Sequence, residues 1–357
     1  MCGSRGPGPL DTALAKLGLM ASVTITDVAH RAGVSMKTVS RVMNAEPHVR
    51  EQVREKVLRA ARELSYRPKV SARSLAGARS YQLGFLLHQV SPYGMHAALG
   101  ALRACRAAGY HLIVETIDLQ ALELPSDMEA MTNSLSVDGM ILLAPVCDNA
   151  VVLDALSAAA IPVARIAPAT ERPAAAQIEV QDEAAARTIT DHLLDLGHRH
   201  IGLVQGPVGH AASARRLAGF SKALAARGLQ PAPELMQQGL FTFESGRQAA
   251  ERLLRLKSPP TAVFATNDLM ALGVMAKAQE LGRSIPGDLS VAGFDDIASA
   301  SMVWPGLTTM RQPMADMAAA AAEAVIAAAG KEPPAQIARP AFACELVVRG
   351  STARPRG

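Results

Sequence analysis

Residues 23–77 read VTITDVAHRAGVSMKTVSRVMNAEPHVREQVREKVLRAARELSYRPKVSARSLAG, and this stretch decides the fold of the amino-terminal part of the chain. Apolar residues recur at helical spacing in three segments, which predicts helices over about 27–32, 36–43 and 49–64. Thr26 and Ser35 precede the first two helices, where a hydroxyl can accept an orphan backbone N–H bond. Gly33 permits a tight turn between them. This pattern predicts an all-α helix-turn-helix DNA-binding head over 23–66.

The positive charge of the chain is concentrated in this head. Residues 22–79 hold 12 Lys or Arg against 5 Asp or Glu, a net charge of +7, whereas the rest of the chain holds 24 against 27, a net charge of −3. A basic head on a slightly acidic body is what DNA-phosphate binding by the head alone requires. A charged helix face that is merely solvated is the alternative.

From about residue 81, apolar runs of strand length alternate with Ala- and Leu-rich helical stretches. Near-continuous apolar strands separated by helices predict parallel sheets that are covered on both faces. About 275 residues are too many for one core, so two α/β lobes are expected. The predicted strands are 83–87, 111–116, 139–144, 163–166, 200–204, 262–265 and 289–294.

Motifs of other protein classes do not occur in the sequence. Cys2, Cys105, Cys147 and Cys344 lack paired or metal-ligand spacing, so neither a disulfide framework nor a metal site is predicted. No phosphate loop, GxSxG or GxGxxG motif stands in the right context, which argues against an enzyme and against a bound cofactor. No apolar run approaches the length of a membrane span. We therefore expect a cytoplasmic protein with no membrane partner.

Residues 1–22 are rich in Gly, Pro and small residues and lack an apolar core of the length that a secretion signal has. They are expected to form a disordered leader. Alternatively, translation starts at Met20, directly ahead of the head.

Several motifs of the chain together resemble the lac repressor (LacI/GalR) family of bacterial transcription regulators. DVAHRAGVSMKTVSRVMN at 27–44, REKVLRAARELSYRP at 54–68 and SARSLAG at 71–77 are similar to the head of that family. GFDD at 293–296, LTTMRQP at 307–313 and ELVVRGST at 345–352 extend the match nearly to the carboxyl terminus. The resemblance implies a periplasmic-binding-protein-like body, in which two lobes of parallel sheets flanked by helices enclose a ligand cleft.

The resemblance also implies the division of the remaining chain. It predicts a hinge helix or linker over 67–80, an effector-binding and dimerisation domain over 81–350 and a tail over 351–357. The chain is expected to cross between the lobes near Asp182, Gln312 and Lys331, which assigns 81–181 and 313–330 to one lobe and 182–312 and 331–350 to the other. The region past Glu345 lacks the leucine heptads that join lac repressor dimers into tetramers, so a homodimer is expected.

In the head, the resemblance places base-reading side chains at Met36 and Lys37, and Arg41 lies one turn further on, where it could pair with guanine. Core packing is the alternative for Met36. Short polar side chains are assigned to phosphates. In family members, a hinge leucine wedges into the minor groove, here Leu75, and a linker without a DNA role is the alternative. The predicted DNA contacts are Thr24, Ser35, Met36, Lys37, Thr38, Ser40, Arg41, Asn44, His48, Lys69, Ala72, Arg73 and Leu75.

In the body, Arg216 matches the effector-binding arginine of the family, and Phe241 occupies a position that is aromatic in related regulators and could stack on a sugar ring. Polar residues that directly follow a strand, such as Asn267 and Asp295, should point into the cleft. A helix cap is the alternative for Asp268 and Asp295, and an ion pair is the alternative for Arg216. The predicted effector contacts are Tyr93, Arg165, His210, Ser213, Arg216, Phe241, Asn267, Asp268 and Asp295.

Taken together, these features predict a sequence-specific DNA-binding transcription regulator. The resemblance implies a repressor of a carbohydrate-utilisation operon, which a sugar or glycoside releases from double-stranded operator DNA. Activation or corepression within the same family stays open. A solute-binding protein is disfavoured, because it should carry a secretion signal and no basic head.

Overall fold

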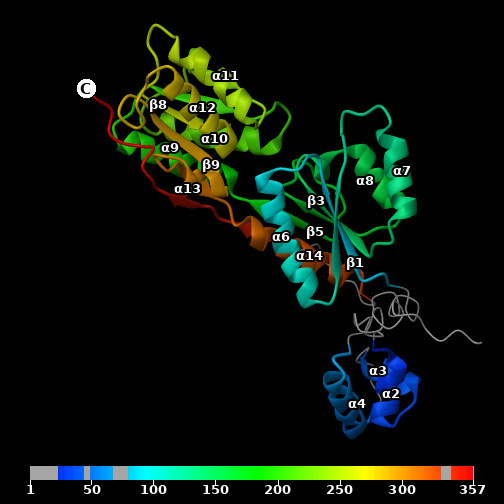
Figure 1. Cartoon of the computed structure of the whole chain (residues 1–357). Helices are drawn as coiled ribbons and strands as arrows, with labels where there is room; N and C mark the ends of the chain where they lie inside the picture. Colours follow the sequence, from blue (N-terminus) through cyan, green and yellow to red (C-terminus); the bar gives the residue numbers. More distant parts are fainter. Residues whose placement is uncertain (1–22, 44–48, 67–78, 331–338, 357) are drawn as a thin grey trace, which may run out of the picture. The chain divides into compact units, whose positions relative to one another are not determined.

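The computed structural model describes residues 23–43, 49–66, 79–330 and 339–356. The chain divides into a helical unit that ends at Ser80 and an α/β unit that begins at Tyr81. Figure 1 shows both units, with most of the helices and some of the strands labelled. The following predicted features lie outside the described residues: the leader 1–22, Asn44, His48, Lys69, Ala72, Arg73, Leu75 and Lys331.

The helical unit is built on one small apolar core. Its helices are α2 (Ile25–Ala32), α3 (Met36–Met43) and α4 (Glu51–Glu63). Gly33 ends α2 in the left-handed conformation at φ 63°, which glycine adopts without strain and which turns the chain toward α3. Ser35 caps α3 as predicted, because its Oγ accepts the backbone N–H of Thr38 at 3.1 Å. The buried residues of the core are Val28, Ala29, Ala32, Val39, Val42, Val57, Ala60 and Ala61.

The first helix begins earlier than predicted. Thr24 rather than Thr26 occupies the N-cap, and its backbone N–H and its hydroxyl donate to the Asp27 carboxylate at 2.7 and 2.8 Å. Thr26 lies inside α2, and its hydroxyl donates to the sulfur of Met36 at 3.3 Å. The prediction failed because two threonines stand two residues apart, and only one of them is followed three residues later by an acidic side chain.

The α/β unit consists of two lobes, each with a six-stranded sheet. The first sheet has the order β11-β5-β4-β3-β1-β2, and all its pairs are parallel. Its strands are β1 (Gln82–Leu87), β2 (His111–Thr116), β3 (Gly139–Leu143), β4 (Val163–Ile166), β5 (Ala176–Val180) and β11 (Ala341–Phe342). Helices α6 (Pro92–Ala107) and α14 (Met314–Ala328) pack on one face, and α7 (Leu124–Ser134) and α8 (Ala150–Ala158) pack on the other.

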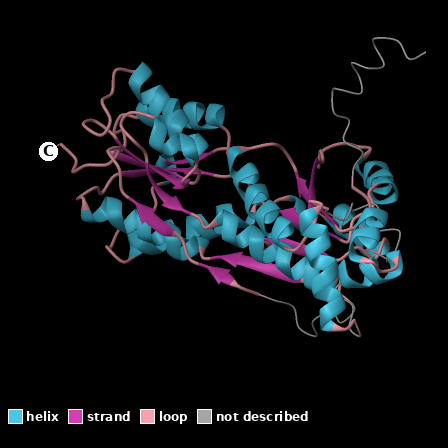
Figure 2. Cartoon of the chain, turned by 60° about the horizontal axis from the view of Figure 1, so that its bottom comes forward, coloured by secondary structure: helices cyan, strands magenta, loops and turns pink. Residues whose placement is uncertain are grey.

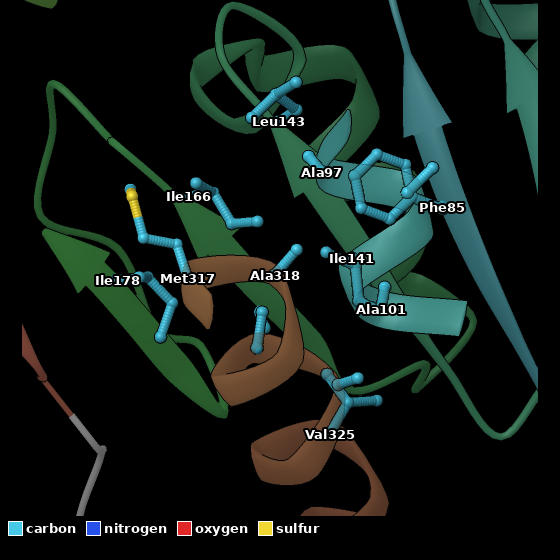
Figure 3. Packing of buried hydrophobic residues seen from close by; sticks show 14 of the residues in the cluster. Phe85, Ala97, Ala101, Ile141, Leu143, Ile166, Ile178, Met317, Ala318 and Val325 are labelled. Carbon is cyan, nitrogen blue, oxygen red and sulfur yellow. The ribbon is translucent and has the colours of Figure 1, made fainter. Parts of the chain in front are cut away.

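The core of the first lobe lies between its sheet and the pair of helices α6 and α14. In Figure 3, side chains of α14 face those of strands β3, β4 and β5, as expected for the alternating residues of buried parallel strands. Gly100 of α6 allows the two helices to approach closely, because a Cβ there would lie 2.1 Å from the carbonyl oxygen of Ala315. The labelled residues are Phe85, Ala97, Ala101, Ile141, Leu143, Ile166, Ile178, Met317, Ala318 and Val325.

The second sheet has the order β12-β10-β9-β8-β6-β7, in which the edge strand β12 is antiparallel to β10. Its strands are β6 (Ile201–Gln205), β7 (Met236–Gln238), β8 (Ala262–Ala265), β9 (Ser290–Asp295), β10 (Thr308–Arg311) and β12 (Glu345–Val347). Helices α9 (Asp182–Asp195) and α10 (Ala211–Ala225) cover one face, and α11 (Phe243–Leu254) and α12 (Asp268–Glu280) cover the other. Figure 2 shows helices on both sides of the strands. Shorter helices are η1 (Val146–Asp148), η2 (Pro233–Leu235) and α13 (Ala298–Met302).

The chain passes between the two lobes three times. It leaves the first sheet at Gln181, between β5 and α9, and returns at Gln312, between β10 and α14. The third passage was predicted near Lys331. However, β11 pairs with β5 of the first sheet and β12 pairs with β10 of the second, so this passage runs between Phe342 and Glu345.

The segment that follows β12 is part of the second lobe and not a separate tail as predicted. The fully buried Ser351 accepts the backbone N–H of Thr308 at 2.8 Å and donates to the carbonyl of Val291 at 2.6 Å. The carbonyl oxygen of Ala353 lies 2.9 Å from Nε2 of His198. These contacts attach residues 351–353 to strands β9 and β10 and to His198, which precedes β6.

Candidate nucleic-acid interface and ligand cavity

Helix α3 presents three exposed side chains on the face that points away from the core. Met36, Lys37 and Arg41 are exposed, whereas Val39 and Val42 of the same helix are buried. Met36 therefore does not pack in the core. Lysine and arginine donors on an exposed helix, together with one apolar side chain, suit the acceptors and methyl groups on the floor of a major groove.

Other predicted DNA contacts lie at the starts of the first two helices. Thr24 and Ser35 are exposed, and Thr38 and Ser40 are partly exposed. The hydroxyls of Ser35 and Thr38 lie 2.9 Å apart at the N-terminus of α3. Backbone N–H groups and hydroxyls at a helix N-terminus favour an anion such as a phosphate. The head thus has an exposed helix face and, beside it, a set of polar groups that suit a phosphate.

A cavity of about 670 Å³ lies between the two lobes of the α/β unit. Both lobes line it, with Tyr93 and Asp148 from the first lobe and Arg216, Phe241 and Asn267 from the second. A volume of this size is typical of sites for small organic ligands. Six of the nine predicted effector contacts line the cavity: Tyr93, His210, Arg216, Phe241, Asn267 and Asp295.

Arg216 is held at the centre of a buried charged cluster. Its Nε donates to Oδ1 of Asp182 at 2.9 Å, and its Nη1 donates to the carbonyl of Thr266 at 2.5 Å. The same Nη1 lies 3.7 Å from Oδ1 of Asp295, and the guanidinium carbon lies 3.7 Å from the centre of the Phe294 ring. The guanidinium charge is therefore already matched by two carboxylates, and the group is oriented by the protein itself.

Asp295 ends strand β9 in a strained conformation beside Arg216. Its φ of 116° is one that residues other than glycine rarely adopt. Its Oδ1 accepts from Nε2 of Gln312 at 2.7 Å. Burial raises the pKa of Asp295 to about 7, although Arg216 and Gln312 act in the opposite direction. Desolvation outweighs the ion pair because the two charges are 3.7 Å apart and lack a direct hydrogen bond.

We expect Asp295 to make the stability of the α/β unit fall as pH rises toward neutrality. An unfolded carboxyl titrates near pH 4, so between about pH 4 and pH 7 the folded protein holds a proton that the unfolded chain has lost. This favourable contribution is complete below the unfolded pKa and disappears as pH rises through the folded pKa. The decrease in the free energy of unfolding from pH 5 to pH 8 should be smaller in Asp295→Asn than in the wild type, by roughly 1–3 kcal/mol.

Urea unfolding at several pH values measures this difference. The exposed Asp154, which pairs with Arg172 on the surface, supplies the control Asp154→Asn, whose pH profile should follow the wild type. Parallel profiles for Asp295→Asn and the wild type would show that Asp295 does not take up a proton on folding.

An aromatic pair and a phenol complete the cavity wall. The rings of His210 and Phe241 meet edge to face with their centres 5.2 Å apart. Burial, followed by the charge of Arg216, lowers the pKa of His210 to about 4, so its ring is neutral near pH 7. Within the described part of the chain, its buried Nδ1 has no hydrogen-bond partner. Burial and the charge of Asp295 raise the pKa of Tyr93, which therefore stays protonated and can donate.

Asn267 combines a structural role with a place in the lining. Its Oδ1 accepts the backbone N–H of Met270 at 3.0 Å, which caps helix α12. Its Nδ2 donates to the carbonyl of Phe241 at 3.1 Å. One amide side chain thus caps α12 and holds the backbone of Phe241 in the cavity wall.

Arg165 does not line the cavity, contrary to the prediction. Its side chain is fully buried, and its Nη2 donates to Asp148 at 2.7 Å and to the hydroxyl of Thr170 at 2.9 Å. Its Nε and Nη1 donate to backbone carbonyls. All of its nitrogens are thereby occupied within the first lobe, so Arg165 orders a loop instead of meeting a ligand.

Asp268 and Ser213 also lie outside the cavity lining. The buried Asp268 accepts the backbone N–H of Ile297 at 2.9 Å and the hydroxyl of Thr309 at 2.5 Å. It therefore links α12 to the neighbouring strand ends. Ser213 faces Gly206, where an added Cβ would lie 2.4 Å from the serine oxygen.

Polar residues that were not predicted as ligand contacts also line the cavity, among them the acidic Asp148 and Asp182. Asp182 was predicted only as the point where the chain crosses between the lobes. It follows the end of β5 by two residues, and Asp295 stands at the end of β9, so a position near a strand end was the available signal. Among the residues that the structure describes, no His, Cys, Asp and Glu side chains group as metal ligands, and no helix is both long and apolar enough to cross a membrane.

Comparison with known proteins gives consistent matches over both units. A family model described as bacterial regulatory proteins, lacI family, matches residues 24–69, and one described as a periplasmic binding protein-like domain matches residues 190–352. The chain is 34% identical to catabolite control protein A of Priestia megaterium over 307 residues, which are 84% of this chain and 90% of that protein.

Two solved structures are similar along most of the chain. A lac repressor dimer bound to operator and the anti-inducer ONPF has a TM-score of 0.73 and 29% identity, covering 93% of this chain and 99% of that one. The transcriptional regulator CelR in complex with cellobiose has a TM-score of 0.71 and 28% identity, covering 92% of this chain and 99% of that one.

Proposed function

This chain belongs to the lacI family of bacterial regulatory proteins, which are DNA-binding transcription regulators and not enzymes, and on that premise we propose that it represses a carbohydrate-utilisation operon. A homodimer binds a near-palindromic operator through its two heads. A neutral saccharide bound between the lobes releases it. The observation that carries this proposal is the cavity of about 670 Å³, whose lining comes from both lobes.

The chemistry of the cavity supports a saccharide as the ligand. Asp182 and Asp295 lie beside Arg216 and fix the orientation of its guanidinium, which can offer N–H donors to ligand hydroxyls. Neutral His210 and protonated Tyr93 add polar groups suited to hydroxyls. The ring of Phe241 offers an apolar face of the kind that sugar rings stack on.

The regulation follows from two arrangements of the lobes with different operator affinities. A ligand that contacts both lobes favours the arrangement in which the cavity surfaces of both lobes can bind it at once. Moving such an equilibrium from 99:1 to 1:99 requires about 5.5 kcal/mol of differential binding. Several hydroxyl hydrogen bonds and one stacked ring can supply much of this free energy, because each well-oriented bond to a charged group contributes about 1.5–3 kcal/mol.

Selection of genomic fragments by the purified full chain, followed by gel-shift titration against mono- and disaccharides including cellobiose, tests the proposal. We expect tight binding to one fragment class, weakened by at least one saccharide. Equal affinity for random duplex at moderate salt would contradict the DNA-binding part. Selective DNA binding that no saccharide changes would contradict the effector part, and tighter binding with a saccharide would indicate corepression.

We expect an exposed apolar segment of the second lobe to contribute to the homodimer. Met302 is 79% exposed and Trp304 is 89% exposed, and adjacent exposed apolar side chains of this size mark interaction surfaces. Trp304→Asp should weaken dimerisation at least about tenfold, because a buried interfacial Trp commonly contributes 2 kcal/mol or more. Sedimentation equilibrium measures the dissociation constant.

The control for this prediction is Leu122→Asp. Leu122 is 92% exposed but is followed by the exposed Glu123, so it does not extend an apolar patch. The control should dimerise like the wild type. Equal dissociation constants for Trp304→Asp and the wild type would place the dimer contact elsewhere.

A further inference from the structure

Arg215 connects the two lobes next to the ligand cavity. From α10 in the second lobe, its Nη1 donates to the backbone carbonyl of Pro168 in the first lobe at 3.3 Å. Its Nε donates to Oδ2 of Asp182 at 3.1 Å. The side chain is 33% exposed, so part of the contact is shielded from water. A single arginine thus joins a loop of one lobe to a buried carboxylate of the other.

The carboxylate that holds Arg215 also holds the arginine in the cavity. Oδ2 of Asp182 accepts from Arg215, and Oδ1 accepts from Arg216 at 2.9 Å. Asp182 is fully buried at the first residue of α9, directly after the chain crosses from the first lobe. Two consecutive arginines therefore share one carboxylate, and a displacement of either guanidinium must be accommodated by the other.

The acceptor for Arg215 lies on a loop that is itself fixed. The backbone N–H groups of Ala169 and Thr170 donate to Asp148 at 2.9 and 3.2 Å. Arg165 donates to the carbonyl of Thr170 at 2.9 Å. Because these bonds hold the residues beside Pro168, its carbonyl moves only with the first lobe as a whole. Asp148 also lines the cavity, so its hydrogen bonds connect the loop to the cavity wall.

We propose that Arg215 is a positioning residue that sets the separation of the lobes and links it to the state of the cavity. The link runs from Arg216 in the cavity through Asp182 to Arg215, and from there to the first lobe. A ligand that shifts Arg216 redistributes the bonds of Asp182 and so strengthens or releases the contact between the lobes. These contacts form a contiguous chain of charged hydrogen bonds, the kind of network that can carry coupling between sites.

The proposal deepens the proposed function, because it concerns the same cavity, yet it can be tested without DNA or ligand. Spin labels are attached at Ser157→Cys in α8 and Gln248→Cys in α11, both exposed and in different lobes. Cys2 and Cys344 are replaced by Ala in every sample, and Cys105 and Cys147 are buried. Labelled full-length protomers are diluted with unlabelled ones, so that pulsed dipolar spectroscopy reports distances within one chain.

In Arg215→Ala, we expect at least a twofold loss of the population at the wild-type distance and a new population at longer distances. Arg215→Lys, which keeps the charge beside Asp182, should give an intermediate distribution. The matched control is Arg227→Ala, since Arg227 is 36% exposed and pairs with Asp195 inside the second lobe. Its distance distribution should equal that of the wild type.

Thermal melting of each variant separates lobe movement from unfolding, because only samples that are fully folded at the measuring temperature are compared. Coincident distributions for Arg215→Ala, Arg227→Ala and the wild type would overturn the proposal. Distance distributions that broaden equally in Arg215→Ala and Arg227→Ala would also overturn it, because the broadening would then come from a general loosening of α9 and α10. Neither result depends on whether a saccharide is the effector.

Discussion

Arg216→Ala is expected to lower the free energy of unfolding of the α/β unit by about 3–5 kcal/mol, the range found when one partner of a buried ion pair is removed. The substitution leaves the buried Asp182 without its Oδ1 partner and Asp295 without its counter-charge. It also leaves the carbonyl of Thr266 without its donor. Asp182 then keeps only Arg215 as its partner and Asp295 keeps only Gln312, so buried polar groups lose partners together and the loss should exceed that of a surface arginine.

Urea unfolding of the full chain measures the loss for the second lobe. Arg227→Ala serves as the comparison, because this exposed pair with Asp195 should contribute little to stability. Below its melting temperature, Arg216→Ala should still bind DNA through the head but should no longer respond to a saccharide. A loss of less than about 1 kcal/mol would mean that water or a neighbouring side chain replaces the guanidinium.

Val39→Asp is expected to unfold the head and to abolish sequence-specific DNA binding. Val39 is fully buried in a core of eight residues, and a carboxylate placed there has no cationic partner inside that core. Burying an unpaired charge costs several kcal/mol, while a domain of this size is only marginally stable. At moderate salt, we expect the preference for a selected genomic fragment over random duplex to be lost, because base contacts require a folded α3, whereas the Lys and Arg side chains of the unfolded head still attract phosphates at low salt.

The control for the head is Met36→Ala on the exposed face of the same helix. This variant should keep its helical circular dichroism and its affinity for random duplex, because Met36 contributes neither charge nor core packing. The α/β unit has apolar clusters of its own, which contain no residue of the head. Its melting transition should therefore be unchanged in Val39→Asp, and a transition lost together with that of the head would contradict this.

Much of the fold could be predicted from local sequence patterns. The seven predicted strands match β1, β2, β3, β4, β6, β8 and β9 within one residue at each end, because apolar runs of that length are typical of buried parallel strands. Strands β7, β11 and β12 have three residues or fewer, too short for a period-two pattern to be visible. The third crossing was misplaced for this reason, since the two residues of β11 carry no signal of their own.

Residues of the candidate site could be predicted where a position at the end of a strand determines the direction of the side chain. Asn267 and Asp295 stand at strand ends, and both line the cavity. Arg165 was misassigned because its partner Asp148 is 17 residues away and becomes its neighbour only after β3 and β4 pair. The contact of Arg215 with Pro168 joins elements that are 47 residues apart in sequence, so no local pattern could reveal it.

The attachment of residues 351–353 to strands β9 and β10 has a practical consequence for handling the gene. A premature stop codon after Gly350 would remove hydrogen-bond partners from Thr308 and His198. A reporter fused directly at Ser351 would have the same effect. Cloning designs should therefore retain the complete reading frame through Arg356, whose guanidinium contacts Asp288 at 2.9 Å, and append any tag beyond it.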